Sequence, residues 1–185
     1  MAVVSLLYLW YKNVPMKKNN KIQGFTLLEL MITLAVAIVI TTIGVPSFMG
    51  LIRDSRMTTI ANDFLTDLSY ARSEAATRNK EVIIQSQSGT ALEWQDGWVI
   101  FYLDDSDPPV PVILRRHIKL PSGYKLVSNS ATFNDQIVYE STGLMSTSFN
   151  GSFFLCMNND ASTARAVVIN SLGRARIDTA PGSCS

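Results

Sequence analysis

The chain has 185 residues, of which 47% are apolar and 17% are charged, and its formal net charge is +1 at pH 7. The apolar fraction excludes a disordered chain, and the balanced charge excludes a strongly basic, histone-like nucleic-acid binder. Two cysteines are too few for a small disulfide-built domain or a four-cysteine zinc site. The length allows one globular domain and an extension.

Residues 25–52 form an apolar run, FTLLELMITLAVAIVITTIGVPSFMGLI, in which Glu29 is the single ionisable side chain. A helix over this run would extend roughly 42 Å, more than the roughly 30 Å of a bilayer core. The alternative is a buried core helix, but such helices seldom run this long without a polar interruption. We therefore expect residues 25–52 to form a membrane-spanning helix.

The flanks of this run predict its orientation. Lys17, Lys18 and Lys21 precede it with no acid between residues 1 and 24, whereas a mixed set, Arg53, Asp54 and Arg56, follows it. Because positive flanks stay in the cytoplasm, the N-terminus is expected inside and residues 53–185 outside; in a bacterium this makes residues 53–185 a periplasmic head on an inner-membrane helix.

The junction Gly24-Phe25-Thr26-Leu27-Leu28-Glu29 resembles the prepilin signature of type IV pilins and type II secretion pseudopilins. The resemblance implies that a prepilin peptidase cuts between Gly24 and Phe25, and that Phe25 is N-methylated. It also implies a partner for Glu29, the N-terminal amine of a neighbouring pilin in the filament. Such a partner would offset the cost of a carboxylate in a bilayer, about 2.5–3.5 kcal/mol. The alternative is a tolerated charge near the membrane surface.

Residues 1–24 are thus expected to be a removable leader. Residues 1–15 fit no part of the prepilin pattern, whereas a start at Met16 gives a nine-residue basic leader, so we expect translation to begin there. Cleavage removes four lysines and no acid, which leaves 12 basic and 15 acidic side chains and a net charge of −3.

Beyond the apolar run, side chains recur at helical spacing. The apolar stripe comprises Ile60, Phe64, Leu68, Ala71 and Ala75, and the charged residues Asp63, Asp67, Arg72 and Glu74 lie mostly off it. This pattern predicts a helix from Phe25 to about Arg78 whose second half is amphipathic and packs on the head.

The remaining chain alternates short apolar runs with turn residues, which predicts strands. The expected strands are 82–85, 94–103, 112–118, 124–127, 136–139, 152–157 and 166–169. The predicted fold is α+β, a long N-terminal helix packed on an antiparallel β-sheet head.

Three segments carry a narrower resemblance: LSYARSEAATRNKEV at 68–82, DGWVIFYLDD at 96–105 and INSLGRARI at 169–177. In this order they resemble the GspH/FimT family of minor pilins and minor pseudopilins. The resemblance implies a head of two β-sheets against the helix, and a role in priming or capping a filament. It implies assembly with other pilins at the cell surface.

No catalytic residue, cofactor or metal is predicted. His117 is the single histidine, and no HExxH, P-loop or GxSxG motif occurs. Asp104, Asp105 and Asp107 could gather a hard cation, but such a cluster before two prolines is more often a solvated turn. Cys156 and Cys184 are expected to form a disulfide in the periplasm, with two free thiols as the alternative.

The sequence Gly173-Arg174-Ala175-Arg176 resembles the GRxR element of FimT-type minor pilins that bind DNA in natural transformation. Spacing of i and i+2 would place Arg174 and Arg176 on one face of an extended segment, where both guanidinium groups could grip phosphate oxygens. Two solvated arginines at a hairpin are the alternative.

A second basic stretch would add to this site if it adjoins it. Residues 108–134 contain no acid but carry Arg115, Arg116, Lys119 and Lys125. The sequence therefore predicts a minor type IV pilin whose head binds double-stranded DNA weakly and without sequence preference. The alternatives are a minor pilin that only primes or caps the pilus, and a type II secretion minor pseudopilin.

Overall fold

The computed structural model describes residues 24–88, 92–147, 150–178 and 184. Residues 1–23 of the expected leader, including Met16, lie outside the described residues. The chain divides into two compact units, residues 1–47 and 48–185, and each is described by itself. The predicted boundary between residues 52 and 53 stays a prediction.

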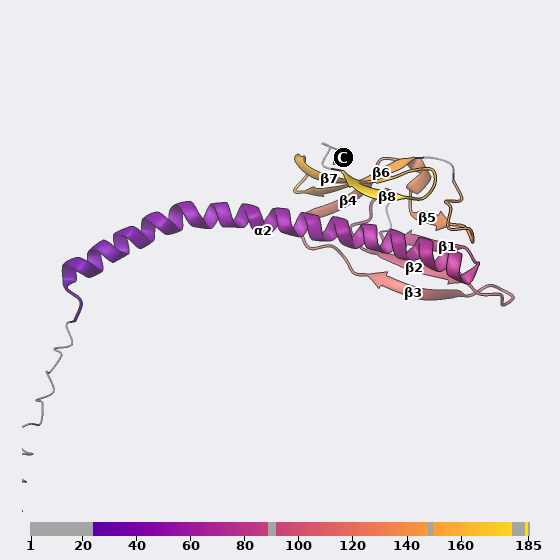
Figure 1. Cartoon of the computed structure of the whole chain (residues 1–185), viewed down its shortest axis with the longest axis horizontal. Helices are drawn as coiled ribbons and strands as arrows, with labels where there is room; N and C mark the ends of the chain where they lie inside the picture. Colours follow the sequence, from indigo (N-terminus) through magenta and orange to yellow (C-terminus); the bar gives the residue numbers. More distant parts are fainter. Residues whose placement is uncertain (1–23, 89–91, 148–149, 179–183, 185) are drawn as a thin grey trace, which may run out of the picture. The chain divides into compact units, whose positions relative to one another are not determined.

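Helix α2 spans Leu27–Arg78, which confirms the long N-terminal helix (Figure 1). Thr26 caps its start, because the Thr26 Oγ1 accepts a hydrogen bond of 3.2 Å from the backbone N–H of Glu29. At the other end, Asn79 takes a left-handed φ of 53°, and the N–H of Lys80 donates to the carbonyl of Ala75 at 3.3 Å. This is a Schellman-type end, which stops the helix where the first strand begins.

The first half of α2 carries the expected apolar surface. Among the described residues it contains one window with the length and composition needed to cross a membrane, with a mean hydropathy of 2.3 and no buried residue. Leu28, Ile40 and Phe48, for example, are each more than 60% exposed. Because exposed apolar area on this scale is unfavourable in water, this surface requires lipid or neighbouring subunits.

The head contains two four-stranded antiparallel sheets (Figure 1). The first sheet has the order β3 (Pro111–His117), β2 (Trp98–Leu103), β1 (Val82–Ser86), β5 (Gln136–Tyr139). The second has the order β4 (Tyr124–Ser128), β6 (Gly151–Met157), β7 (Asp160–Ile169), β8 (Ala175–Asp178). A short 3-10 helix, η1 (Ala131–Phe133), precedes β5. The α+β fold is therefore confirmed.

Two strands differ from the prediction by more than one residue at an end, and one was not predicted. The strand expected from residue 94 begins at Trp98, because Gly97 turns the chain with a φ of 97° and its Cα lies against the backbone of His117. Strand β7 begins six residues earlier than expected. It follows a tight two-residue turn in which Asn158 and Asn159 both have positive φ. Strand β8 was missed because its four residues lack an apolar run.

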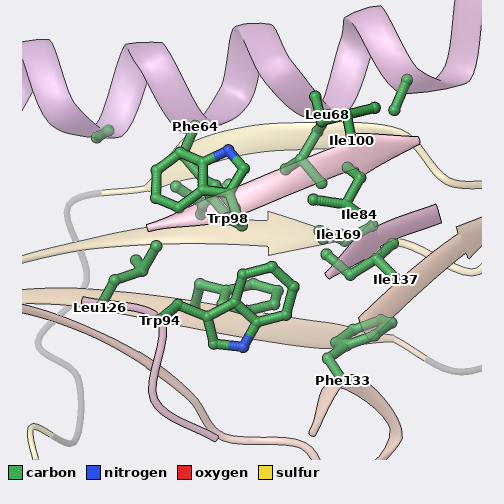
Figure 2. Close-up of a cluster of buried hydrophobic side chains, with 14 of the residues drawn as sticks. Phe64, Leu68, Ile84, Trp94, Trp98, Ile100, Leu126, Phe133, Ile137 and Ile169 are labelled. Carbon is green, nitrogen blue, oxygen red and sulfur yellow. The ribbon is translucent and has the colours of Figure 1, made fainter. Parts of the chain in front are cut away.

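The second half of α2 supplies one wall of the core, and the two sheets supply the others. Phe64 lies edge-on to Trp98 and Phe153, each with ring centroids 4.9 Å apart, and Trp94 completes the cluster at 5.9 Å (Figure 2). Phe64, Leu68, Ala71 and Ala75 are fully buried, which confirms the predicted apolar stripe.

Candidate functional site

The β7–β8 turn, residues 170–174, presents the predicted arginines. The Asn170 side-chain Oδ1 accepts hydrogen bonds from the N–H groups of Leu172 at 3.1 Å and Arg174 at 2.9 Å. The Asn170 backbone N–H donates to the carbonyl of Arg174 at 3.0 Å, and its carbonyl accepts from Gly173 at 2.9 Å. These four bonds fix the turn before any ligand arrives.

Gly173 has a structural role in this turn. Its φ is +74°, and a Cβ built there would lie 2.7 Å from Cε1 of Tyr139 and 3.1 Å from Cγ of Met145. The buried Tyr139 hydroxyl also donates to the Gly173 carbonyl at 3.2 Å. Burial raises the pKa of Tyr139 to about 12, so its hydroxyl keeps the donated proton at neutral pH. Packing and backbone conformation therefore explain this glycine without a ligand.

The two arginines of the turn, in contrast, are exposed and contribute nothing to the core. Both line one hollow of about 250 Å³ beside Val168 and Asn170 on the outer face of the second sheet. Arg176 approaches Asp178 with a separation of 3.6 Å, while its side chain stays 72% exposed. Within the described part of the chain, no acidic group lies within ion-pair distance of Arg174. The Arg174 guanidinium is thus available to an anion, and the exposed Arg176 guanidinium has only the long contact to Asp178 to give up.

The basic stretch 115–125 lies elsewhere. Arg115 and Arg116 belong to β3, which is at the edge of the first sheet opposite β5, whereas the turn packs on Tyr139 of β5. Lys125 belongs to β4, at the edge of the second sheet opposite β8. The structure therefore does not bring this stretch together with Arg174 and Arg176.

Two of the four basic side chains in that stretch already have partners. Lys119 pairs with Asp96 at 2.8 Å. Arg115 pairs with Asp67 at 2.7 Å, and its guanidinium lies 4.4 Å from the ring centroid of Tyr70. These contacts tie β3 and the loop after it to the fold.

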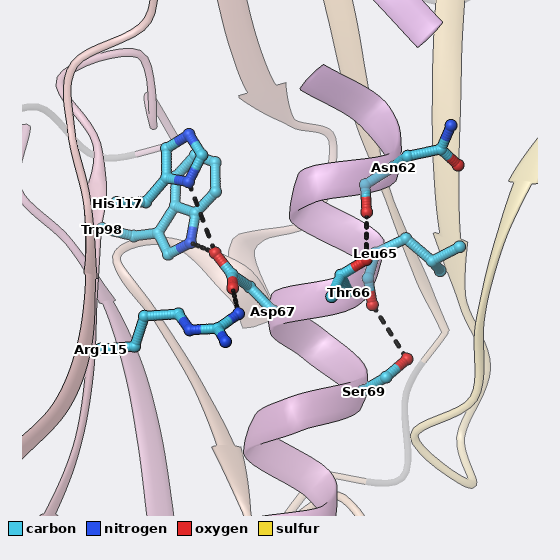
Figure 3. Close-up of polar contacts among 8 residues, drawn as sticks. All are labelled: Asn62, Leu65, Thr66, Asp67, Ser69, Trp98, Arg115 and His117. Carbon is cyan, nitrogen blue, oxygen red and sulfur yellow. Dashed lines mark hydrogen bonds and ion pairs between the residues drawn. The ribbon is translucent and has the colours of Figure 1, made fainter. Parts of the chain in front are cut away.

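The buried carboxylate of Asp67 is the centre of a polar cluster that joins α2 to the first sheet (Figure 3). Its Oδ2 accepts from Trp98 Nε1 at 2.9 Å and lies 3.5 Å from Nδ1 of His117, and its Oδ1 accepts from Arg115. Burial alone would raise the pKa of this carboxyl. The hydrogen bonds from His117, Arg115 and Trp98 outweigh that effect and hold the pKa below its usual range. Asp67 was expected off the buried stripe, so its 3% exposure corrects that prediction.

The sequence pattern that could have predicted this cluster lies on β3. Arg115 and His117 are two residues apart and so point to one face of the strand. Both side chains face Asp67 of α2, so this pair marked the face of β3 that contacts the helix. His117 also stacks on Trp98, with ring centroids 4.0 Å apart, so this histidine packs as part of the fold.

The aspartate-rich loop after β2 is a hydrogen-bonded turn. Asp104 accepts from the backbone N–H of Val110 at 2.8 Å, and Asp105 pairs with Lys80 at 2.6 Å. Among the described residues, no group of three histidine, cysteine or acidic side chains has an arrangement that could hold a metal ion.

Cys156 and Cys184 form a disulfide, as predicted, with their Cα atoms 5.9 Å apart. The bond attaches residue 184 to β6, where both cysteines are buried with Ala164. Cys184 is therefore anchored to the same sheet that carries the turn.

At the other end of the chain, Gly24 and Phe25 precede α2 and are exposed. Glu29 lies in the first turn of the helix, three residues after the Thr26 cap, which is the spacing of a capping box. A carboxylate there also interacts favourably with the positive end of the helix dipole. This local role was missed, and the proposed filament partner of Glu29 stays a prediction.

Comparison with known proteins agrees with this architecture. The profile of the family described as type II transport protein GspH matches residues 61–173, and the prokaryotic N-terminal methylation motif matches residues 19–45. Two crystal structures of the type IV minor pilin FimU of Pseudomonas aeruginosa are similar. Each is 24% identical, with TM-scores of 0.61 and 0.59. They cover 71% and 69% of this chain, and 96% and 99% of their own. No curated protein sequence matches significantly.

A methylation motif, a long apolar helix and a two-sheet head together define a pilin-like subunit. Since the family profile covers more than half of the chain, the protein belongs to the GspH family. This is a family of structural proteins. The motif implies processing by prepilin peptidase and assembly with other pilins, and it indicates a subunit that is first anchored in a membrane and then built into a filament.

Proposed function

We propose that this chain is a minor type IV pilin whose head binds duplex DNA through Arg174 and Arg176 and supports DNA uptake in natural transformation. One observation carries the proposal: the turn is fixed by Asn170 and Gly173, yet the two arginines that it presents are solvated and serve no packing role. Guanidinium groups on a rigid turn lose little freedom when they bind phosphate oxygens.

Binding of this kind is electrostatic. Two phosphate contacts on a processed chain of net charge −3 give weak affinity that falls steeply with salt. The overall avidity for one DNA molecule rises when several subunits or several contacts bind it together. The head would reach DNA from the periplasmic side of the inner membrane, as the positive flank of the apolar helix predicts, and then from the assembled pilus.

The test is DNA binding by the full chain in detergent micelles. We expect Arg174→Gln with Arg176→Gln to weaken binding of mixed-sequence duplex DNA about tenfold, and to lower the slope of log affinity against log salt by about 2. The matched control is Arg78→Gln with Lys80→Gln. It removes the same charge from two cations that pair with acids and lie over the ring of Tyr102 in the first sheet. Equal affinity of the two double variants would overturn the proposal.

A second candidate function is a minor pseudopilin of a type II secretion system, because the matching family is described as a type II transport protein. The same double variant separates the two in the native bacterium. A DNA-binding pilin loses transformation while its filaments still assemble. A secretion pseudopilin keeps transformation unchanged, and only its deletion stops protein export.

A further inference from the structure

A second hollow lies on the other side of the β7–β8 turn, between that turn and α2. It has a volume of about 450 Å³ and is lined by Ser69, Arg72, Ser73, Ala76, Thr142, Gly143, Gly173, Arg174 and Ala175. Ser73, Ala76, Thr142 and Arg174 are exposed, so the hollow opens to solvent. Arg174 lines both this hollow and the one that it shares with Arg176.

Arg72 enters this hollow from the helix in a fixed orientation. Its Nε donates to the carbonyl of Gly143 at 2.8 Å, so the plane of the guanidinium is held while its two terminal nitrogens remain for another acceptor. Over the described ranges of the chain, no carboxylate lies within ion-pair distance of Arg72. Arg78, six residues further along the helix, instead pairs with Glu74 at 2.6 Å.

The lining of the hollow suits an anion. Among the described residues that line it, none is acidic, whereas Arg72 and Arg174 contribute two positive charges from two separate elements. The Thr142 Oγ1 accepts from the N–H of Leu144 at 3.3 Å, which leaves its own proton to donate. Ser73 adds a second hydroxyl. Two guanidinium groups and two hydroxyls are donors typical of phosphate recognition.

We infer that this hollow holds one phosphate group of the DNA backbone, between Arg72 of α2 and Arg174 of the turn. The inference rests on the proposed function and deepens it. The DNA-binding surface then extends from Arg176 through Arg174 onto the helix, and its cations come from two elements that the fold holds together. Phosphate is the shared chemistry of a DNA backbone and of a free inorganic ion, and we assign the DNA backbone because Arg174 belongs to both hollows.

The first experiment measures duplex DNA affinity of the full chain in detergent. We expect Arg72→Gln to weaken binding about fivefold and to lower the salt slope by about 1. Its matched control, Arg78→Gln, removes the same charge from the other flank of the buried stripe on the same helix and should bind as the unchanged chain does. Thermal unfolding of both variants shows whether the loss of the Arg72–Gly143 bond has altered the fold.

A second variant leaves that bond in place. Ala76→Glu puts a carboxylate into the hollow one helical turn from Arg72, where it competes with phosphate. Thr77→Glu makes the same charge change on the solvent face of α2. Weaker DNA binding by Ala76→Glu than by Thr77→Glu supports the inference. Equal binding of the two, with Arg72→Gln matching Arg78→Gln, overturns it.

Two further outcomes separate this inference from the proposed function. If Arg174→Gln with Arg176→Gln weakens DNA binding while Arg72→Gln and Ala76→Glu do not, the hollow is not a DNA contact and the proposed function stands. If none of these variants weakens binding, the proposed function fails as well. Titration of the chain with inorganic phosphate identifies a free-ion site: phosphate binding lost in Arg72→Gln, without a change in DNA affinity, overturns the assignment to DNA.

Discussion

The head has two groups of basic residues that differ in how far acidic side chains pair with them. The stretch 115–125 has more cations in sequence, but Arg115 and Lys119 are paired with Asp67 and Asp96. The turn 170–174 and the start of β8 have only Arg174 and Arg176, and both are exposed on a backbone that is already fixed. Arg174 has no acidic partner among the described residues, and Arg176 has only the 3.6 Å contact to Asp178. The comparison teaches that the number of basic residues in a stretch of sequence does not predict whether that stretch forms a binding surface. What matters is whether the fold supplies acids of its own to the cations.

Arg115 and Arg174 also contact different sides of α2. Residues on a helix advance by about 100° each, so Asp67, Tyr70 and Arg78 flank one side of the buried stripe, while Ser69, Arg72 and Ala76 flank the other. The first set contacts Arg115 and Tyr102 of the first sheet, and the second set lines the hollow beside the turn. The helix therefore separates a structural cluster from a candidate binding surface.

The largest expected effect breaks the turn itself. Gly173→Ala forces a side chain into a left-handed backbone and against the ring of Tyr139, and should lower the free energy of unfolding by about 3 kcal/mol. The matched variant is Gly143→Ala, which has a similar φ of +75° but no neighbour closer than 3.5 Å, and should cost about 1 kcal/mol. Urea unfolding measures both. Equal costs would show that the contact with Tyr139 does not constrain the turn.

A smaller effect is expected in the structural cluster. Asp67→Asn removes the charge that Arg115 and His117 face, and should lower the free energy of unfolding at pH 7 by about 2 kcal/mol. This cost is smaller than that of breaking a fully buried ion pair, because the Arg115 side chain is 45% exposed. Asp178→Asn, which removes the partner of exposed Arg176, should change it by less than about 0.5 kcal/mol.

The same cluster should show a pH dependence with a definite sign. The pKa of Asp67 is lower in the folded chain than in the unfolded chain, so its contribution is fully present above the unfolded value of about 3.9. That contribution is lost as the pH falls through the folded pKa. The stability difference between the unchanged chain and Asp67→Asn should therefore shrink below about pH 4. A difference that stays constant down to pH 2 would contradict this account.

The smallest expected effect concerns the two basic residues of the 115–125 stretch that form no ion pair within the described chain, Arg116 and Lys125. Because β3 and β4 lie at the sheet edges away from the turn, Arg116→Gln with Lys125→Gln should lower DNA affinity less than about twofold. Fluorescence anisotropy with labelled duplex DNA measures it. A loss as large as that of the Arg174, Arg176 double variant would move the DNA contact to this face.

Much of this protein follows from the sequence by itself. The length of the apolar run predicted that the first half of α2 is a helix able to span a membrane, because such a span needs about twenty apolar residues. The helical period of Phe64, Leu68, Ala71 and Ala75 predicted the buried stripe, because side chains three and four positions apart share one face. The alternation of apolar and turn residues gave most strands, and two cysteines allowed one disulfide.

Tertiary structure alone decided the rest. Which cations are neutralised depends on partners from distant elements: Asp67 lies 48 residues before Arg115. Gly173 is required because Tyr139, remote in sequence, packs against it, and Arg72 meets Arg174 only because the turn folds back onto the helix. Sequence periodicity reports which face of an element is apolar. It does not report which elements meet, and the meeting of elements determines where a charge is paired and where it is left for a ligand.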